Sequence, residues 1–123
     1  MNALLADDEE APREQLRAAL ARLWPELHIV ATSSNGAEAW DDCLQHEPQI
    51  AFLDIRMPGL TGLEVARRLA RLAQPPLIVF VSAHQDHALD AFDAGAIDYV
   101  LKPVEDYTLS LHDALPKDRK SVV

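Results

Sequence analysis

The chain has 123 residues and a net charge of −9, so it is long enough for one domain with a buried core. Its acidity argues against nucleic-acid binding by this domain itself, and its one cysteine, Cys43, excludes a disulfide framework or a cysteine-based metal site. The sequence has no signal peptide and no apolar run of about 20 residues, so we expect a cytoplasmic protein without membrane contact.

Short apolar runs alternate with helical patterns along the first half of the chain. Strands are predicted over residues 2–6, 27–31 and 50–53, and helices over residues 11–23 and from about 37 to 46. The run at 50–53 is apolar throughout, which is typical of a strand buried on both faces. In the second helix, Ala37, Trp40 and Leu44 are expected on one face.

The same alternation continues through the second half. Helices are predicted over residues 61–72 and 87–94, and strands over residues 77–81 and 97–101. Inward positions are expected at Leu63, Ala66, Leu69 and Ala70 of the first helix, and at Ala88 and Phe92 of the second. We interpret Arg67, Arg68 and Arg71 as a solvated helix face rather than a phosphate site. Alternating strands and helices predict an α/β fold with a parallel sheet between two layers of helices.

Polar side chains stand at the ends of four predicted strands. Asp7 and Asp8 follow the first strand, Asp54 the third, Ser82 the fourth and Lys102 the fifth. Because the carboxyl ends of parallel strands meet at one edge of a sheet, these groups are expected to converge. Close carboxylates repel one another unless they are protonated or bind a cation, and oxygen-only ligands suit Mg²⁺.

A carboxylate beside Mg²⁺ can accept a phosphoryl group as an acyl phosphate. In that case Lys102 would spread the charge of the transferred group, and Ser82 would donate a hydrogen bond to it. Each residue also has an ordinary explanation: Asp54 as a cap or turn residue, Lys102 as a solvated lysine, Ser82 as a strand-end cap, and Asp7-Asp8 as the approach to a helix. Their joint placement at four strand ends favours the phosphoryl-accepting site.

Four motifs extend this pattern: ADDE at 6–9, LDIRMPGLTG at 53–62, FVSA at 80–83 and DYVLKP at 98–103. In this order and spacing they resemble the receiver domain of bacterial two-component response regulators, across residues 1–106. The resemblance implies a flavodoxin-like, doubly wound sheet of five parallel strands in the order 2-1-3-4-5.

The resemblance also implies roles for individual residues. Asp54 would be the phosphoacceptor, and Mg²⁺ would be held by Asp7 (through water), Asp8, Asp54 and the backbone carbonyl of Arg56. Ser82 and Lys102 would bind the phosphoryl group, with Ser82 and Tyr99 as the switch residues. The peptide bond between Lys102 and Pro103 is expected to be cis.

The implied function is a signalling switch that a sensor histidine kinase phosphorylates to control an output such as transcription. Residues 82–92 and 96–99 look most like receivers that precede a LytTR-type DNA-binding domain, so DNA would be bound only through an output domain that is absent here. A homodimer is expected through the face made by the helix at 87–94, the strand at 97–101 and a last helix. Enzyme activity is expected only as self-phosphorylation from phosphodonors and self-dephosphorylation.

Two alternatives stay open. A pseudo-receiver would bind partners without ever accepting phosphate, although Asp8, Asp54, Ser82 and Lys102 argue against it. A phosphatase with an aspartyl-phosphate intermediate would usually carry a second Asp two residues after the nucleophile, where Arg56 stands here.

Residues 107–123 do not continue the receiver pattern. Residues 107–116 resemble one translated reading frame of a common sequencing adapter, and residues 118–123 resemble a frame of its complementary strand. We therefore expect the true sequence to stop near Asp106 and the tail to be an artefact. The spacing of Tyr107, Leu111 and Leu115 could nevertheless imitate the last helix of a receiver.

Overall fold

Five parallel strands form one sheet in the computed structural model, which describes residues 1–102 and 104. From one edge to the other, the strands are β2 (His28–Ser33), β1 (Asn2–Ala6), β3 (Ile50–Leu53), β4 (Leu77–Ser82) and β5 (Asp98–Leu101). This order, 2-1-3-4-5, confirms the doubly wound α/β fold expected from the sequence.

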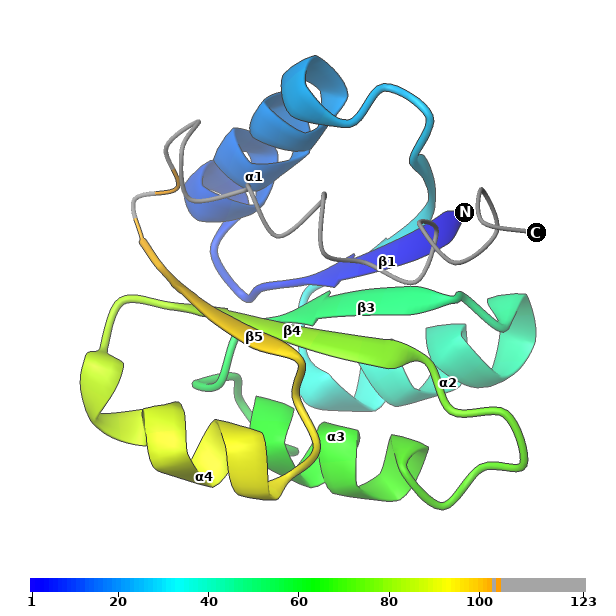
Figure 1. Ribbon diagram of the computed structural model, residues 1–123, viewed down its shortest axis with the longest axis vertical. Helices are drawn as coiled ribbons and strands as arrows, with labels where there is room; N and C mark the ends of the chain where they lie inside the picture. Colours follow the sequence, from blue (N-terminus) through cyan, green and yellow to red (C-terminus); the bar gives the residue numbers. More distant parts are fainter. Residues whose placement is uncertain (103, 105–123) are drawn as a thin grey trace, which may run out of the picture.

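Helices cover both faces of the sheet (Figure 1). The helix α1 (Glu10–Leu23) lies on one face, and α2 (Gly36–His46), α3 (Gly62–Leu69) and α4 (Ala88–Asp93) lie on the other. A 3₁₀ turn, η1 (Gln85–His87), leads directly into α4. Each of the first four strands is therefore followed by a segment that crosses one face, and the parallel pairing puts the carboxyl ends of all five strands at the same edge.

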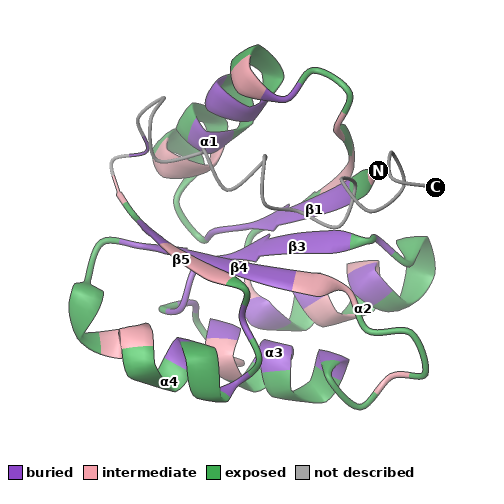
Figure 2. Cartoon of the chain, viewed as in Figure 1, coloured by how far each residue is buried: buried purple, intermediate pink, exposed green. Residues whose placement is uncertain are grey.

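The sheet divides the apolar core into two layers because side chains alternate between its faces. In β1, Leu4 and Ala6 pack in the layer with α2, α3 and α4, whereas Ala3 and Leu5 pack in the layer with α1. The strand β3 is buried at all four positions, as its apolar run predicts (Figure 2). Because the sheet is packed on both faces, the residues at its carboxyl edge extend from a rigid backbone.

The inward face of α2 differs from the predicted one. Ala37 is exposed and Leu44 is 48% exposed, whereas Ala39 and Cys43 are buried and Trp40 is half-buried. Small side chains let the helix approach the sheet closely, and this turns the larger leucine outward. The burial of Cys43, together with the nearby Asp42, raises the pKa of its thiol to about 12.

The prediction for α4 is also wrong for its largest side chain, Phe92, which was expected to face the core. Phe92 is 50% exposed and Ala88 is half-buried, whereas Ala91 is completely buried. The core-facing residues here are small: Ala91, Ala94 and Ala96 pack in the layer with α2 and α3, and this places Phe92 toward solvent.

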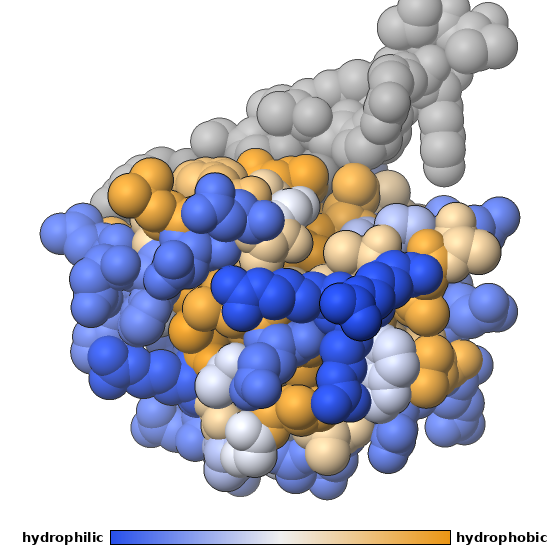
Figure 3. All heavy atoms as spheres, turned by 90° about the horizontal axis from the view of Figure 1, so that it is seen from below, coloured by the Kyte–Doolittle hydropathy of each residue, from blue (hydrophilic) through white to orange (hydrophobic). Residues whose placement is uncertain are grey.

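In α3 the prediction holds for Ala66 and Leu69, which are buried, and in part for Leu63, which is half-buried. Val65 is buried as well, and Ala70 is exposed because the helix ends at Leu69. The three arginines expected on the outer face are all exposed: Arg67, Arg68 and Arg71. Figure 3 looks onto the face made by α2, α3 and α4, where hydrophilic side chains run across hydrophobic ones.

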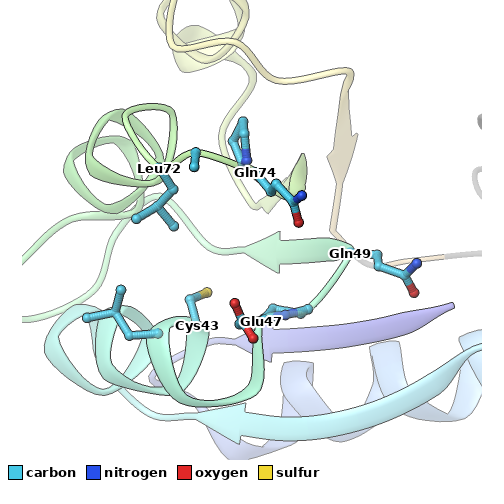
Figure 4. Close-up of a pocket in the computed structure, with 9 residues that line it drawn as sticks. Cys43, Glu47, Gln49, Leu72 and Gln74 are labelled. Carbon is cyan, nitrogen blue, oxygen red and sulfur yellow. The ribbon is translucent and has the colours of Figure 1, made fainter.

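A pocket of about 430 Å³ opens at the amino edge of the sheet, opposite the end where Asp54 follows β3. Figure 4 shows its labelled lining residues, which come from the end of α2 and from the segments leading into β3 and β4: Cys43, Glu47, Gln49, Leu72 and Gln74. This pocket therefore does not contain the strand-end residues that the sequence singles out.

The expected cis bond to Pro103, the expected last helix of the dimer face and the adapter-like tail all lie outside the described residues. Among residues 1–102 and 104, no helix is both long and apolar enough to cross a membrane.

Candidate functional site

Asp7 and Asp54 are placed by the register of β1 and β3. Ala6 and Leu53 are paired, so the next residue of each strand emerges at the same level of the carboxyl edge. The backbone N–H of Asp54 donates to the carbonyl of Ala6 at 2.9 Å, and that of Asp7 donates to the carbonyl of Ser33 at 3.0 Å. These bonds continue the sheet by one step, so both carboxylates start from rigid backbone.

The three carboxylates predicted to converge do so. Asp7, Asp8 and Asp54 each offer an oxygen atom, and these oxygens lie within 4.8 Å of one another. Asp7 and Asp54 are both 6% exposed, and Asp8 is exposed to solvent. Three oxygen donors with one side open to water match the ligand preferences of Mg²⁺, which retains water and phosphate oxygens in its shell. The residues therefore fit a hard divalent cation.

Lys102 joins this group from the end of β5. Its Nζ lies 2.6 Å from Oδ2 of Asp7 and 3.0 Å from Oδ2 of Asp54. The ammonium thus bridges the two buried carboxylates and balances part of their charge. An anionic group bound beside Asp54 would therefore lie close to this ammonium.

Electrostatics at the site oppose the charge on Asp54. Burial raises the pKa of the Asp54 carboxyl, and the Asp7 carboxylate adds to the rise, although Lys102 and the backbone N–H of Arg56 act in the other direction. Burial disfavours the charge on Lys102, but its hydrogen bonds to Asp7 and Asp54 outweigh burial and raise the pKa of the ammonium. Without a cation, the site therefore holds a firmly charged lysine and a carboxylate that is costly to ionise.

Ser82 lies at the end of β4, between the acids and Lys102 in the order of the strands. It is 1% exposed, and its Oγ accepts a hydrogen bond from the backbone N–H of His84 at 3.2 Å. Its carbonyl accepts a hydrogen bond from the backbone N–H of Lys102 at 2.8 Å. The hydroxyl is thus buried at the same carboxyl edge as the acids, as predicted.

Tyr99 is a half-buried residue of β5 whose ring packs against the core layer of α2, α3 and α4. Its hydroxyl donates a hydrogen bond to the carbonyl of His84. His84 therefore contacts both predicted switch residues, because its N–H binds Ser82 and its carbonyl binds Tyr99. Arg56 lies in the loop after β3, exposed between buried Ile55 and Met57.

Two contacts around Asp7 were not predicted from the sequence. The guanidinium of Arg13, in the first turn of α1, donates to the carbonyl of Asp7 at 2.8 Å. The backbone N–H of Glu9 donates to Oδ1 of Asp7 at 3.0 Å. Together they fix the loop between β1 and α1. A cation one helical turn beyond an acidic loop is the only sequence signal that pointed toward Arg13.

Comparison with known proteins gives relatives over most of the chain. It is 49% identical over 108 residues to an uncharacterised response regulatory protein of Vibrio cholerae, covering 88% of this chain and 41% of that protein. It is 42% identical over 117 residues to the positive alginate biosynthesis regulatory protein of Pseudomonas aeruginosa, covering 95% and 46%. It is 35% identical over 106 residues to the sensory transduction protein LytT of Bacillus subtilis, covering 86% and 44%. The chain thus spans less than half the length of these relatives.

Solved structures share the same fold. The response regulatory domain of protein mrkE from Klebsiella pneumoniae has a TM-score of 0.88 and 26% identity, covering 98% of this chain and 99% of that one. The signal receiver domain of the response regulator NarL from Mycobacterium tuberculosis has a TM-score of 0.81 and 29% identity, covering 92% and 94%. The model of the response regulator receiver domain family matches residues 3–112, so this chain belongs to that family.

Proposed function

We propose that this domain is switched by transfer of a phosphoryl group to Asp54. The observation that supports the proposal is the meeting of buried Asp54 with Asp7, Asp8 and Lys102 at the carboxyl edge of the sheet. An isolated strand-end aspartate would need none of these neighbours. A phosphoacceptor needs a positive group to hold the transferred phosphoryl oxygens, and acids to bind a cation beside it.

The transfer follows from this arrangement. A carboxylate oxygen of Asp54 attacks the phosphorus of a phosphohistidine on a sensor kinase, forming an O–P bond while the N–P bond breaks and its electron pair returns to the imidazole. The Nζ of Lys102 lies 3.0 Å from the Asp54 carboxylate, so its ammonium can form an ion pair with the oxygens of the transferred phosphoryl group. Ser82, buried at the end of β4, would then donate its hydroxyl hydrogen to one of those oxygens.

Receiver domains of response regulators generally bind Mg²⁺ at an acidic pocket, and the acids of this chain fit such an ion. In our proposal it is held by Asp7, Asp8, Asp54 and the backbone carbonyl of Arg56. The ion would supply positive charge close to the transferred group, where it lowers the repulsion between the incoming phosphate and the carboxylates.

Phosphorylation adds charge and hydrogen-bond acceptors at one point, and the switch residues can carry that change outward. If Ser82 turns toward the phosphoryl group, its bond to the N–H of His84 is lost. The carbonyl of His84 accepts the hydrogen bond of the Tyr99 hydroxyl, so a movement of His84 would also shift the ring of Tyr99. We infer that the resulting change reaches the face formed by α4 and β5.

Receiver domains of response regulators work with sensor kinases and often with DNA-binding output domains, and most response regulators are signalling proteins without enzyme activity. For the whole protein we propose a LytTR-type output domain and control of transcription, since LytT proteins are among the relatives. We further propose that the protein works in the cytoplasm with a histidine kinase, forms a homodimer when phosphorylated, and has only self-phosphorylation and self-dephosphorylation as chemical activities.

Acetyl phosphate and Mg²⁺ provide the test of the phosphoacceptor. Intact-protein mass spectrometry should find one added phosphate on the wild type and none on Asp54→Asn. Chelation of Mg²⁺ should abolish labelling of the wild type, because the buried carboxylates then repel the incoming phosphate. Equal labelling of wild type and Asp54→Asn would refute the assignment of Asp54.

A further inference from the structure

The helices α2 and α3 begin with the same pattern, a capping residue followed by glycine and, two residues later, glutamate. The sequences are Asn35-Gly36-Ala37-Glu38 and Thr61-Gly62-Leu63-Glu64. In each helix the cap side chain accepts the N–H of the glutamate, at 2.8 Å in α2 and 3.2 Å in α3. The glutamate side chains accept backbone N–H groups in return, so the first turn of each helix is fixed in place.

The glycine in each pattern leaves room for the backbone of the loop between β3 and α3. A Cβ atom on Gly62 would lie 2.0 Å from the carbonyl oxygen of Asp54, and one on Gly36 would lie 1.9 Å from the carbonyl oxygen of Leu60. Real Cβ contacts are essentially never shorter than 3.0 Å, and both obstructing atoms belong to the backbone. Neither position can therefore accept a side chain without moving the loop or the helix.

The two glycines act on different ends of this loop. Gly62 touches the backbone of Asp54, and its N–H donates to the carbonyl of Ile55 at 2.8 Å. Gly36 touches the backbone of Leu60, near the end of the loop that enters α3. Buried Met57 and Ile55 anchor the stretch between these contacts, so the loop has little freedom to absorb a shift.

We propose that Gly62 is a positioning residue for the phosphoacceptor, an inference that rests on the proposed role of Asp54. Because Gly62 has no side chain, the capped start of α3 lies directly on the carbonyl of Asp54. This contact and the bond to Ile55 hold the backbone from Asp54 onward, and with it the carboxylate that must meet those of Asp7 and Asp8. Gly36 has an equal steric role but acts away from the acids.

This difference makes Gly36→Ala a matched control for Gly62→Ala. Both substitutions should lower the midpoint of thermal unfolding, because each forces a carbonyl and a methyl group apart. Only Gly62→Ala should also weaken Mg²⁺ binding, by about 10- to 100-fold in titration calorimetry, as is usual when the support of a metal ligand is disturbed. The Mg²⁺-dependent rise in the unfolding midpoint should shrink in the same variant alone.

All proteins are measured in sucrose, which favours the folded state, and Leu16→Ala in the α1 layer serves as a second destabilised control. Wild-type affinity for Mg²⁺ in Gly62→Ala, an equal loss in Gly36→Ala, or failure of Gly62→Ala to fold even in sucrose would each overturn the inference. Lack of labelling of the wild type by acetyl phosphate would instead count against the proposed function. The two failures are thus distinguished by which protein is affected.

Discussion

At Asp54, the surroundings that suit the proposed phosphoryl transfer work against the stability of the folded domain. The carboxyl is buried, its pKa is raised, and Asp7 lies beside it. Lys102 offsets part of this cost by bonding both acids. A bound cation or a phosphoryl group with its own partners would remove more of it, so the site is most stable when occupied.

Asp54→Asn should therefore stabilise the domain in the absence of Mg²⁺ at neutral pH, because the neutral amide avoids the cost of a buried charge beside Asp7. A raised pKa means that the folded state binds the proton more tightly than the unfolded chain does. The wild type thus loses stability as pH rises from the ordinary value of 3.8 through the folded-state pKa of Asp54, and the variant does not. The measurement is the free energy of urea unfolding at several pH values in the presence of a chelator.

The advantage of the variant should be full at neutral pH and should shrink as pH falls toward 3.8. Added Mg²⁺ should stabilise the wild type more than Asp54→Asn, because the variant has lost one ligand. A wild type more stable than the variant at neutral pH without Mg²⁺ would mean that Lys102 more than compensates the burial of Asp54.

Among the elements, the eight-residue helix α3 has a structural role beyond its own packing, because its first turn supports the loop after β3. A capping box holds that turn: Thr61 Oγ1 accepts the N–H of Glu64, and the Glu64 side chain accepts the N–H of Thr61 at 2.9 Å. The hydrogen bond from the Thr61 backbone lowers the pKa of the Glu64 carboxyl.

Thr61→Ala should lower the free energy of unfolding by about 1 kcal/mol, because the N–H of Glu64 loses its partner at the helix start. Thr61→Ser keeps the hydroxyl and should cost less. Urea unfolding followed by far-UV circular dichroism measures both variants. Unchanged stability in Thr61→Ala would show that water replaces the hydroxyl at no cost.

The elements also show what the sequence could and could not reveal. Most strands were predictable because short apolar runs stop at polar residues, and this brings Asp7, Asp54 and Lys102 to one edge. The second strand was predicted over residues 27–31 but runs over His28–Ser33, because its half-exposed positions at the edge of the sheet give a weaker apolar signal. The burial of short, alanine-rich helices was less predictable, since several of their faces are equally apolar. The contacts of Gly62 and Arg13 were less predictable, because both are made to backbone carbonyls, of Asp54 and Asp7, and a backbone acceptor is not identified by its residue type.

On the scale of the molecule, the strands and helices bury most apolar side chains but leave a group exposed on α4 and around β5. Its members and their exposed fractions are Leu89 at 81%, Phe92 at 50%, Ile97 at 43% and Leu101 at 40%. In a chain with a net charge of −9, such a group is a suitable contact for another apolar surface. Tyr99, in the same strand, is connected through His84 to Ser82 at the proposed phosphoacceptor site.

We therefore expect phosphorylation to promote a homodimer through this face, and Phe92→Asp to weaken that dimer at least about tenfold. Burying a phenylalanine side chain contributes about 1.5–3 kcal/mol, and a tenfold change in affinity corresponds to about 1.4 kcal/mol. Sedimentation of the protein with acetyl phosphate and Mg²⁺ measures the effect, and mass spectrometry verifies that the variant is still labelled. Leu44→Asp, at a leucine 48% exposed on α2, places the same charge elsewhere and should leave the dimer intact. A phosphorylated wild type that stays monomeric, or equal losses in both variants, would exclude this face as the interface.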